Sequence, residues 1–173
     1  MRLSVVDGEN LVWVGVAQGA TTGLRYDPGR EQGVVAHLAS SAGGTAWLST
    51  MSDEAALMAA ARQGIAPTRA GAGSHAPTGA TDLLARLAAA RQCGYAVAVD
   101  SYLAGMAAMA VPVRRPDDGN VVGCLSIAGP SVRLDAARME ALAPPLAEAA
   151  AEIGAASRGS RFFTPGPART IPA

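Results

Sequence analysis

Lysine is absent from this chain of 173 residues, and aromatic residues make up only 4% of it. All 14 basic residues are therefore arginines, and 14 acidic residues balance them, so that the formal net charge at pH 7 is zero. Proteins that bind nucleic acid through its phosphates need clustered positive charge, and this balance argues against that function for the chain. With so few aromatic residues, we expect a core of alanine, valine, leucine and methionine.

Cysteine and histidine are also scarce, with two residues of each. Cys93 and Cys124 are too few for a disulfide framework, and the chain has no set of residues with zinc-ligand spacing. The sequence opens directly into a strand-like run without the long apolar core of a signal sequence, and no apolar run is as long as a membrane span, so we expect a cytoplasmic protein without a membrane partner. The sequence contains neither a nucleophile-elbow serine motif nor a phosphate-binding loop. We therefore expect a non-catalytic protein that needs no metal or cofactor.

The strongest strand signals lie between residues 94 and 130. Two apolar runs, Met106–Val113 and Val121–Ile127, flank a segment rich in turn residues (Pro-Asp-Asp-Gly-Asn), and this pattern predicts a β-hairpin. A shorter run, Tyr95–Val99, predicts a third strand beside the hairpin. The polar connection between that strand and the hairpin, Asp100–Gly105, is a place where a ligand could be held.

The rest of the chain predicts further strands and helices. In chain order they are two strands at Arg2–Val6 and Asn10–Gln18, a short strand at Gly23–Asp27, helices at Thr45–Met51, Asp53–Gln63 and Thr81–Cys93, and a last helix at Val132–Ser157. Pro144 and Pro145 should kink or split the last helix. Residues 66–80 are predicted to be a mobile surface loop, and residues 158–173 a disordered tail. These elements predict an α+β fold with a central, mainly antiparallel sheet of about six strands and helices packed against it.

Two segments together resemble the effector-binding domain of IclR-type transcriptional regulators. The first is His37–Ser49, where small residues lead into a helix, and the second runs from Gly94-Tyr95-Ala96 through Asp100 and Gly105 to Leu125-Ser126-Ile127-Ala128-Gly129-Pro130. The resemblance implies a GAF-like domain over residues 1–157 that binds a small organic effector and forms a homo-oligomer. Regulators of this family contact DNA through an N-terminal winged helix-turn-helix domain. We expect this chain to lack that domain.

Residues 40–44 (Ser-Ser-Ala-Gly-Gly) are the first candidate binding segment. Hydroxyl groups and unpaired backbone N–H groups at the start of a helix favour a carboxylate, because the helix dipole attracts negative charge there. Alternatively, these residues only cap the helix and allow it to pack closely. The resemblance places pocket positions on this side at Leu38, Ser41, Ala42 and Gly43.

The resemblance places a second wall of the pocket on the strands. Its positions are Ala98, Met106, Ala108, Ser126 and Ala128, with Asp100 in the neighbouring loop. Family members that bind small polar acids often have an acidic residue, a cysteine and a serine where this chain has Ala98, Ala108 and Ala128. Three methyl groups in their place predict a larger, more apolar pocket, and hence a bulkier effector such as an aromatic or other weakly polar acid.

Several of these residues also have a structural explanation. The Ser126 hydroxyl could bond to neighbouring backbone, Asp100 could stabilise a turn, and Met106 could belong to the core. An alternative function is that of a stand-alone GAF-like enzyme with redox chemistry at Cys124. The simplest explanation of a cysteine in an apolar strand is, however, an inert small hydrophobic residue.

Overall fold

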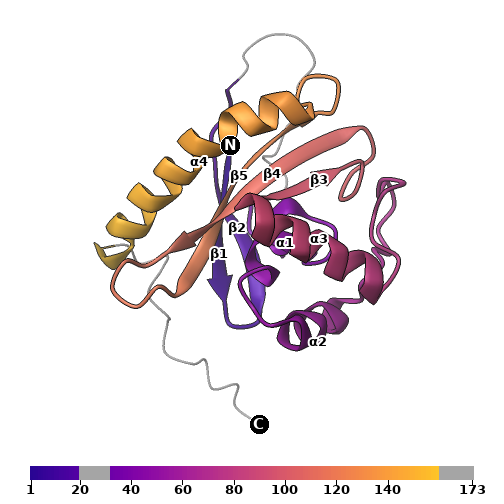
Figure 1. The fold of residues 1–173 in the computed structure, drawn as a ribbon, viewed down its shortest axis with the longest axis horizontal. Coiled ribbons are helices and arrows are strands. Elements are labelled where there is room, and N and C mark those ends of the chain that lie inside the picture. Colours follow the sequence, from indigo (N-terminus) through magenta and orange to yellow (C-terminus); the bar gives the residue numbers. More distant parts are fainter. Residues whose placement is uncertain (20–31, 160–173) are drawn as a thin grey trace.

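Two strands, three helices, three more strands and a long helix follow one another in the computed structural model, which describes residues 1–19 and 32–159 (Figure 1). The strands are β1 (Arg2–Asp7), β2 (Asn10–Val16), β3 (Ala96–Val99), β4 (Met106–Arg114) and β5 (Val121–Pro130). The helices are α1 (Ala42–Leu48), α2 (Asp53–Gln63), α3 (Ala80–Cys93) and α4 (Ala136–Ala156), followed by a 3-10 helix, η2 (Ser157–Gly159). The strand predicted at Gly23–Asp27 and most of the predicted tail lie outside the described residues.

The described strands form one antiparallel sheet in the order β2-β1-β5-β4-β3. Two hairpins that are far apart in the sequence therefore meet where β1 pairs with β5. The predicted α+β fold with a central antiparallel sheet is confirmed, with five strands in the described part of the chain where about six were expected.

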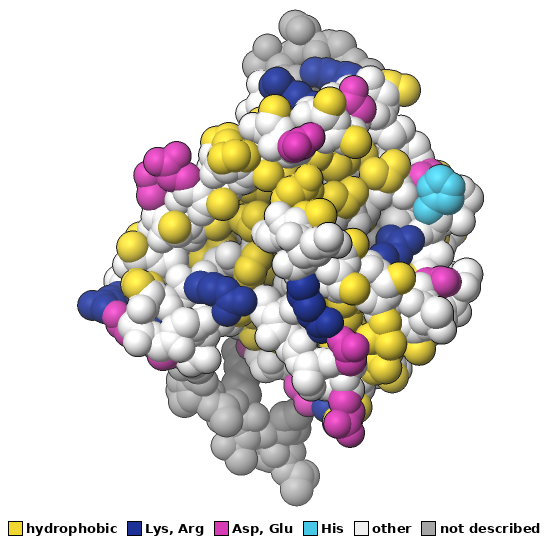
Figure 2. Space-filling view, viewed as in Figure 1, with side chains coloured by type: hydrophobic (Ala, Val, Ile, Leu, Met, Phe, Trp, Pro, Cys, Tyr) yellow, Lys and Arg dark blue, Asp and Glu magenta, His cyan; other side chains and the backbone are white. Residues whose placement is uncertain are grey.

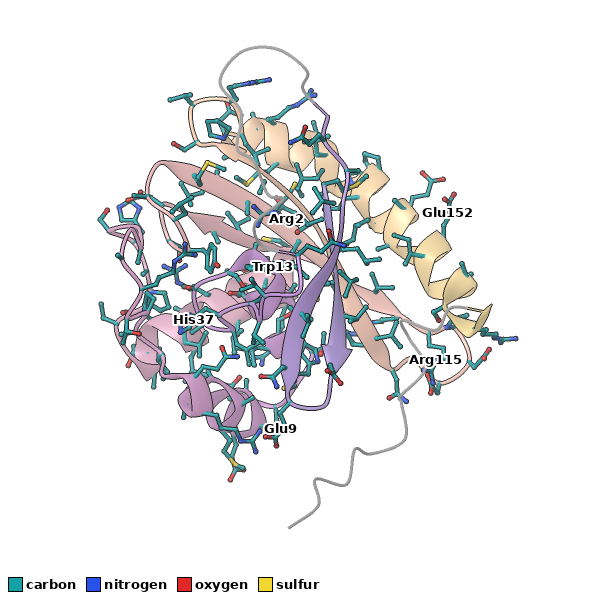
Figure 3. All side chains as sticks on the ribbon, turned by 180° about the vertical axis from the view of Figure 1, so that it is seen from behind. Arg2, Glu9, Trp13, His37, Arg115 and Glu152 are labelled. Carbon is teal, nitrogen blue, oxygen red and sulfur yellow. The ribbon has the colours of Figure 1, made fainter. Side chains whose placement is uncertain are left out.

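Side chains that alternate along the strands give the sheet two buried faces. On β4 and β5, Met109 and Leu125 belong to the core shared with α4, whereas Ala110 and Cys124 belong to the core beneath α1–α3. Trp13 of β2, labelled in Figure 3, also lies in this second core. Figure 1 accordingly shows α4 on one side of the sheet and α1, α2 and α3 grouped on the other.

The edge strand β3 carries apolar side chains that no helix covers completely. Val97 and Val99 are 37% and 38% exposed, whereas their neighbours Ala96 and Ala98 are buried. Figure 2 shows a band of hydrophobic side chains across the middle of the face between α4 and the α1–α3 group.

Helix α1 begins at Ala42, three residues earlier than the predicted start at Thr45. Ser41 caps it, because its hydroxyl accepts a hydrogen bond from the N–H of Gly44 at 3.1 Å. Two glycines in the first turn lower the helix propensity, so the sequence pattern does not indicate that the helix begins at Ala42. Gly44 is required here, since a Cβ atom would overlap the backbone of Leu38.

Helix α4 is continuous through Pro144 and Pro145, so of the predicted kink or split the split is wrong. A proline in a helix leaves the carbonyl group four residues earlier without its donor. For these two prolines the affected carbonyls belong to Glu140 and Ala141, and all four residues are exposed. Water can therefore satisfy the two carbonyl groups, and the buried side of α4 keeps its contacts.

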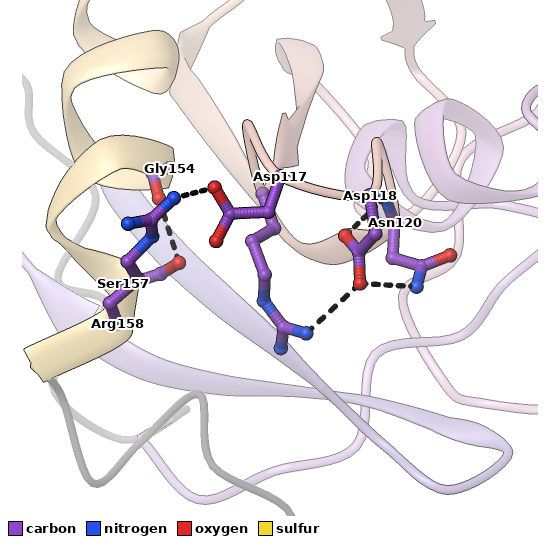
Figure 4. A network of polar contacts seen from close by, with 7 residues as sticks. Asp117, Asp118, Asn120, Gly154, Ser157 and Arg158 are labelled. Carbon is purple, nitrogen blue, oxygen red and sulfur yellow. Dashed lines mark hydrogen bonds and ion pairs between the residues drawn. The ribbon is translucent and has the colours of Figure 1, made fainter.

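A polar network connects the β4–β5 turn with the end of α4 (Figure 4). Arg158 pairs with Asp117, and Arg115 pairs with Asp118 at 3.2 Å. The same Asp118 carboxylate accepts a hydrogen bond from the side-chain amide of Asn120 at 2.7 Å. These groups are partly or largely exposed, so the network orients the turn and contributes little to stability.

Residues 66–79 form the predicted surface loop, and hydrogen bonds hold this loop to the segment after β3. The N–H of Gly73 donates to the carbonyl of Ser101 at 2.9 Å, and the N–H of His75 donates to that of Asp100 at 2.8 Å. These bonds attach the loop to the end of the sheet, which argues against the mobility predicted for it.

Candidate functional site

An apolar cavity lies at the end of the sheet, on the face that carries α1–α3. Its volume is about 30 Å³, enough for about two water molecules. The residues that line it come from β1, β3, β4, β5 and the loop after β3. They are Arg2, Ala98, Tyr102, Leu103, Met106, Ala107, Ala108 and Ala128.

The strand register explains why this end of the sheet is hollow. Ala98 pairs with Ala108, and Ala108 pairs with Ala128, so three methyl groups form a row across β3, β4 and β5. Side chains two residues apart on a strand point to the same face, which places Met106 beside this row. The structure thus brings together Ala98, Met106, Ala108 and Ala128, four of the residues that the resemblance placed in the pocket.

Two arginines and two aromatic rings form a stacked array beside the cavity. The rings of Trp13 and Tyr102 meet edge to face with their centroids 5.3 Å apart. The guanidinium carbon of Arg2 lies 5.3 Å from the centre of the Trp13 ring, and that of Arg69 lies 4.2 Å from the centre of the Tyr102 ring. Figure 3 shows Arg2 and Trp13 close together in the middle of the molecule. This array fixes Tyr102, which lines the cavity.

Arg2 and Ala107 line the cavity although no sequence prediction named them. Tyr102 and Leu103 line it from the segment 100–105, which was predicted as a place for a ligand without either residue being singled out. A signal for Arg2 was present in the alternation of β1, because Arg2 and Ser4 are both buried and both point to the face that carries α1–α3. A charged residue at an inward-facing position of a strand needs a specific environment.

The segment 40–44 is not part of the lining of the cavity. Ser41 caps α1, and a Cβ atom on Gly43 would lie 3.4 Å from Leu11 and 3.9 Å from the Cβ of Cys124. Ala42 is 2% exposed and belongs to the same close packing. Leu38 is fully buried and belongs to the core cluster that also contains Ala98. Tyr102 and Ala108 are partly buried and pack against this cluster. These residues therefore belong to the packing of α1 and the core beneath it, and not to the lining of the cavity.

Ser126 and Asp100 each have a local hydrogen-bond partner. The Ser126 hydroxyl lies 3.4 Å from the carbonyl oxygen of Arg2 on the neighbouring strand. Asp100, whose φ is 47°, accepts hydrogen bonds from Ser74 and from the N–H of Gly105. The bonds from Ser74, followed by that from Gly105, lower the pKa of the Asp100 carboxyl. These hydrogen bonds agree with the alternative that Asp100 stabilises a turn.

A hydrogen-bond chain connects the cavity loop to the segment before α1. The Ser101 hydroxyl donates to the carbonyl of Ser40 at 2.9 Å. The Nδ1 atom of His37 accepts from the N–H of Ser40 at 3.2 Å, and Nε2 lies 2.9 Å from the carbonyl oxygen of Gly64. A carbonyl can only accept, so the proton of the neutral ring is on Nε2. Burial, together with the positive charge of Arg69, lowers the pKa of His37.

The two cysteines are free and lie in different surroundings. Cys124 is fully buried, and burial raises the pKa of its thiol to about 12. The reactive form of cysteine is the thiolate, which is negligible at neutral pH for such a group. Cys93 is exposed at the end of α3. Neither residue supports the alternative of an enzyme with redox chemistry at Cys124.

Among residues 1–19 and 32–159, no group of three or more histidine, cysteine, aspartate or glutamate side chains could hold a metal ion. None of the helices described here has both the length and the apolar character of a membrane span.

Comparison with protein families gives one match, the family described as bacterial transcriptional regulator IclR C-terminal, over residues 2–155. None of the curated proteins compared matches the chain.

Solved structures with the same fold include several regulators and regulator domains. An IclR transcriptional regulator from Alicyclobacillus acidocaldarius has 21% identity and a TM-score of 0.73, over 89% of this chain and 59% of that one. The C-terminal domain of the E. coli regulator KdgR has 22% identity and a TM-score of 0.70, over 89% of this chain and 84% of that domain.

A third structure is the inducer-binding domain of PobR from Acinetobacter, a double mutant in complex with 3-hydroxybenzoic acid. It has 21% identity and a TM-score of 0.71, over 88% of this chain and 86% of that domain. The chain spans about three fifths of the length of the longer regulators that it matches.

Proposed function

Because the chain belongs to the family of C-terminal domains of bacterial IclR transcriptional regulators, we propose that it senses a small organic effector in the cavity between β3, β4, β5 and the loop 100–105. The observation that carries this proposal is the cavity itself. A concave, mostly apolar site with a few polar groups is the usual form of a small-molecule site.

The effector is a weakly polar organic acid. The row formed by Ala98, Ala108 and Ala128 offers methyl groups and no hydrogen-bond partner, which favours a hydrocarbon or aromatic surface. Leu103 and Met106 complete the apolar lining. The 3-hydroxybenzoic acid bound to the PobR domain is a compound of this class, although that protein is only 21% identical to this chain.

Binding requires the cavity to widen, because a volume of about 30 Å³ is too small for a benzoate-sized molecule. Leu103 and Met106 are only half-buried, and their side chains can rotate outward. Methionine in particular adapts its shape at low cost. The effector therefore takes the place of these side chains and shifts the loop 100–105.

In a regulator that carries this domain, such a shift would be transmitted to a DNA-binding domain outside this chain, which is coupling between two sites. The domain would act as a homo-oligomer. The exposed side chains of Val97 and Val99 on the edge strand β3 and the apolar band in Figure 2 support this assembly, because contiguous apolar surface commonly marks an interface.

The test is a thermal-shift screen with benzoate, 3-phenylpropanoate and hexanoate. A ligand that binds only the folded protein raises its Tm by mass action, so at least one acid should stabilise the wild type. Ala128→Leu, which fills the cavity, should abolish the shift. Ala147→Leu, on the exposed side of α4, is the matched control and should preserve it. The proposal fails if no acid raises the Tm of the wild type, or if Ala128→Leu responds like the control.

A further inference from the structure

We propose that Arg2 is the residue that binds the effector's carboxylate, so that the cavity selects monoanionic acids over neutral molecules of the same shape. This inference rests on the proposed function and assigns the charged end of the ligand to β1. Arg2 is 8% exposed and is the one charged residue among the described residues that line the cavity.

The register of the sheet places Arg2 next to the row formed by Ala98, Ala108 and Ala128, two residues further along the strands. Arg2 pairs with Ser126, and Ser126 precedes Ala128 by two residues on the same face of β5. Two residues along a strand correspond to roughly 7 Å. An aromatic or short aliphatic acid has about this length, and its hydrocarbon end would lie on the methyl groups of Ala98, Ala108 and Ala128.

The chemistry of arginine suits this position. A guanidinium stays charged at all physiological pH values and has five N–H donors, so it can bind a carboxylate in addition to partners within the protein. Its guanidinium carbon lies 5.3 Å from the centre of the Trp13 ring, a cation–π contact that helps to position the group. The attraction between the two charges is stronger in such a buried place than in water, because the surrounding dielectric constant is low.

The competing anion site, at the start of α1, is weaker on structural grounds. The helix has seven residues, its first turn is capped by the Ser41 hydroxyl, and the segment around it is closely packed. None of the residues Ser41, Ala42 and Gly43 lines the cavity. A carboxylate in the cavity therefore faces β1 and not α1.

The experiment compares each acid with its neutral amide by isothermal titration calorimetry: benzoate with benzamide, 3-phenylpropanoate with its amide, and hexanoate with hexanamide. For the wild type we expect an acid to bind about tenfold or more tightly than its amide, since a charge-assisted hydrogen bond is lost with the amide. In Arg2→Met the preference should vanish, because the affinity for the acid falls while that for the amide stays within about threefold.

Arg2→Gln provides a second neutral variant that keeps a polar end group, should Arg2→Met fail to fold. Arg62→Met removes the same unit of charge from an exposed arginine that pairs with Glu9, and it should keep the wild-type preference. Persistence of the preference in folded Arg2→Met or Arg2→Gln overturns the role of Arg2, as does a wild type that binds acid and amide equally. A wild type that binds neither compound of any pair instead contradicts the proposed function.

Discussion

At position 41 a serine hydroxyl accepts a hydrogen bond from the N–H of Gly44, and its own backbone carbonyl accepts from the Thr45 hydroxyl at 3.0 Å. Removal of an N-cap hydroxyl typically costs about 1 kcal/mol. Ser41→Ala should therefore lower the free energy of unfolding by about this amount, measured by urea denaturation, and should leave the dissociation constant of the effector unchanged.

This variant also separates the two roles considered for Ser41. If the hydroxyl binds the effector's carboxylate directly, Ser41→Ala weakens binding by about tenfold or more. Ser52→Ala, which removes the cap of α2 far from the cavity, controls for the loss of a helix cap alone. A large loss of affinity in Ser41→Ala but not in Ser52→Ala would contradict the capping role.

His37 gives the folded protein a predictable dependence on acid pH. Burial lowers the pKa of its ring from the ordinary value of 6.5, although the hydrogen bond to Gly64 opposes this effect. Below about pH 6.5 the unfolded chain binds a proton at this residue that the folded protein does not, so the free energy of unfolding decreases as the pH falls. Protonation of Nδ1 would also remove the acceptor used by Ser40.

Urea denaturation of the wild type, His37→Gln and His75→Gln between pH 5 and 7.5 tests this effect. The wild type should lose stability toward pH 5, and the slope should be smaller in His37→Gln. His75 is exposed, and His75→Gln should retain the slope of the wild type. Parallel profiles for the wild type and His37→Gln would show that another group is responsible.

At the scale of the elements, the contact between α4 and β4 depends on a glycine near the end of the helix. Gly154 is buried, and a Cβ atom there would overlap the carbonyl oxygen of Arg114. In an exposed helix the change from glycine to alanine stabilises by about 1 kcal/mol. Here we expect Gly154→Ala to lower the free energy of unfolding by about 1–3 kcal/mol, because α4 must move away from the sheet.

Gly129→Ala is the matched control, since no atom lies within 4 Å of a Cβ built at that strand position. It should change the unfolding free energy by less than about 1 kcal/mol. A stabilised Gly154→Ala variant would mean that helix propensity outweighs the contact with Arg114.

The order and type of the elements could be predicted from the sequence because turn residues and apolar periodicity are local signals. The Asp-Gly turn after β1 and the Pro-Asp-Asp-Gly-Asn turn after β4 define both hairpins. The continuity of α4 could not be predicted in this way. It depends on whether Pro144 and Pro145 face the solvent, which the packing of the whole helix decides.

At the scale of the whole molecule, the site could be predicted only in part. The alanine row follows from strand alternation once the hairpin is placed, and the resemblance identified its members. Arg2 and Tyr102 come from segments distant in sequence that meet only when β1 pairs with β5 and the loop after β3 folds back. The alternation along β1 indicates that Arg2 points inward, but not which residues of other segments it meets.

Two loops distant in sequence, residues 66–79 and 100–105, form one layer at the cavity end of the sheet. Asp100 connects them, because one carboxylate oxygen accepts from Ser74 and the other from the N–H of Gly105. Its backbone conformation, with φ at 47°, is one that aspartate tolerates better than most residues. If effector binding widens the cavity by moving these two loops, the hydrogen bonds of Asp100 determine how easily the loops move.

Asp100→Ala should therefore release both loops together. Hydrogen–deuterium exchange should become faster at residues 71–76 and at residues 101–106, while β1 and β5 keep the protection of the wild type. Effector affinity should fall by severalfold, because the looser layer must be ordered again on binding. Asp117→Ala, in the β4–β5 turn remote from the cavity, is the matched control and should leave exchange in both loops unchanged. Faster exchange in only one loop would show that the two loops move independently and that Asp100 does not couple them.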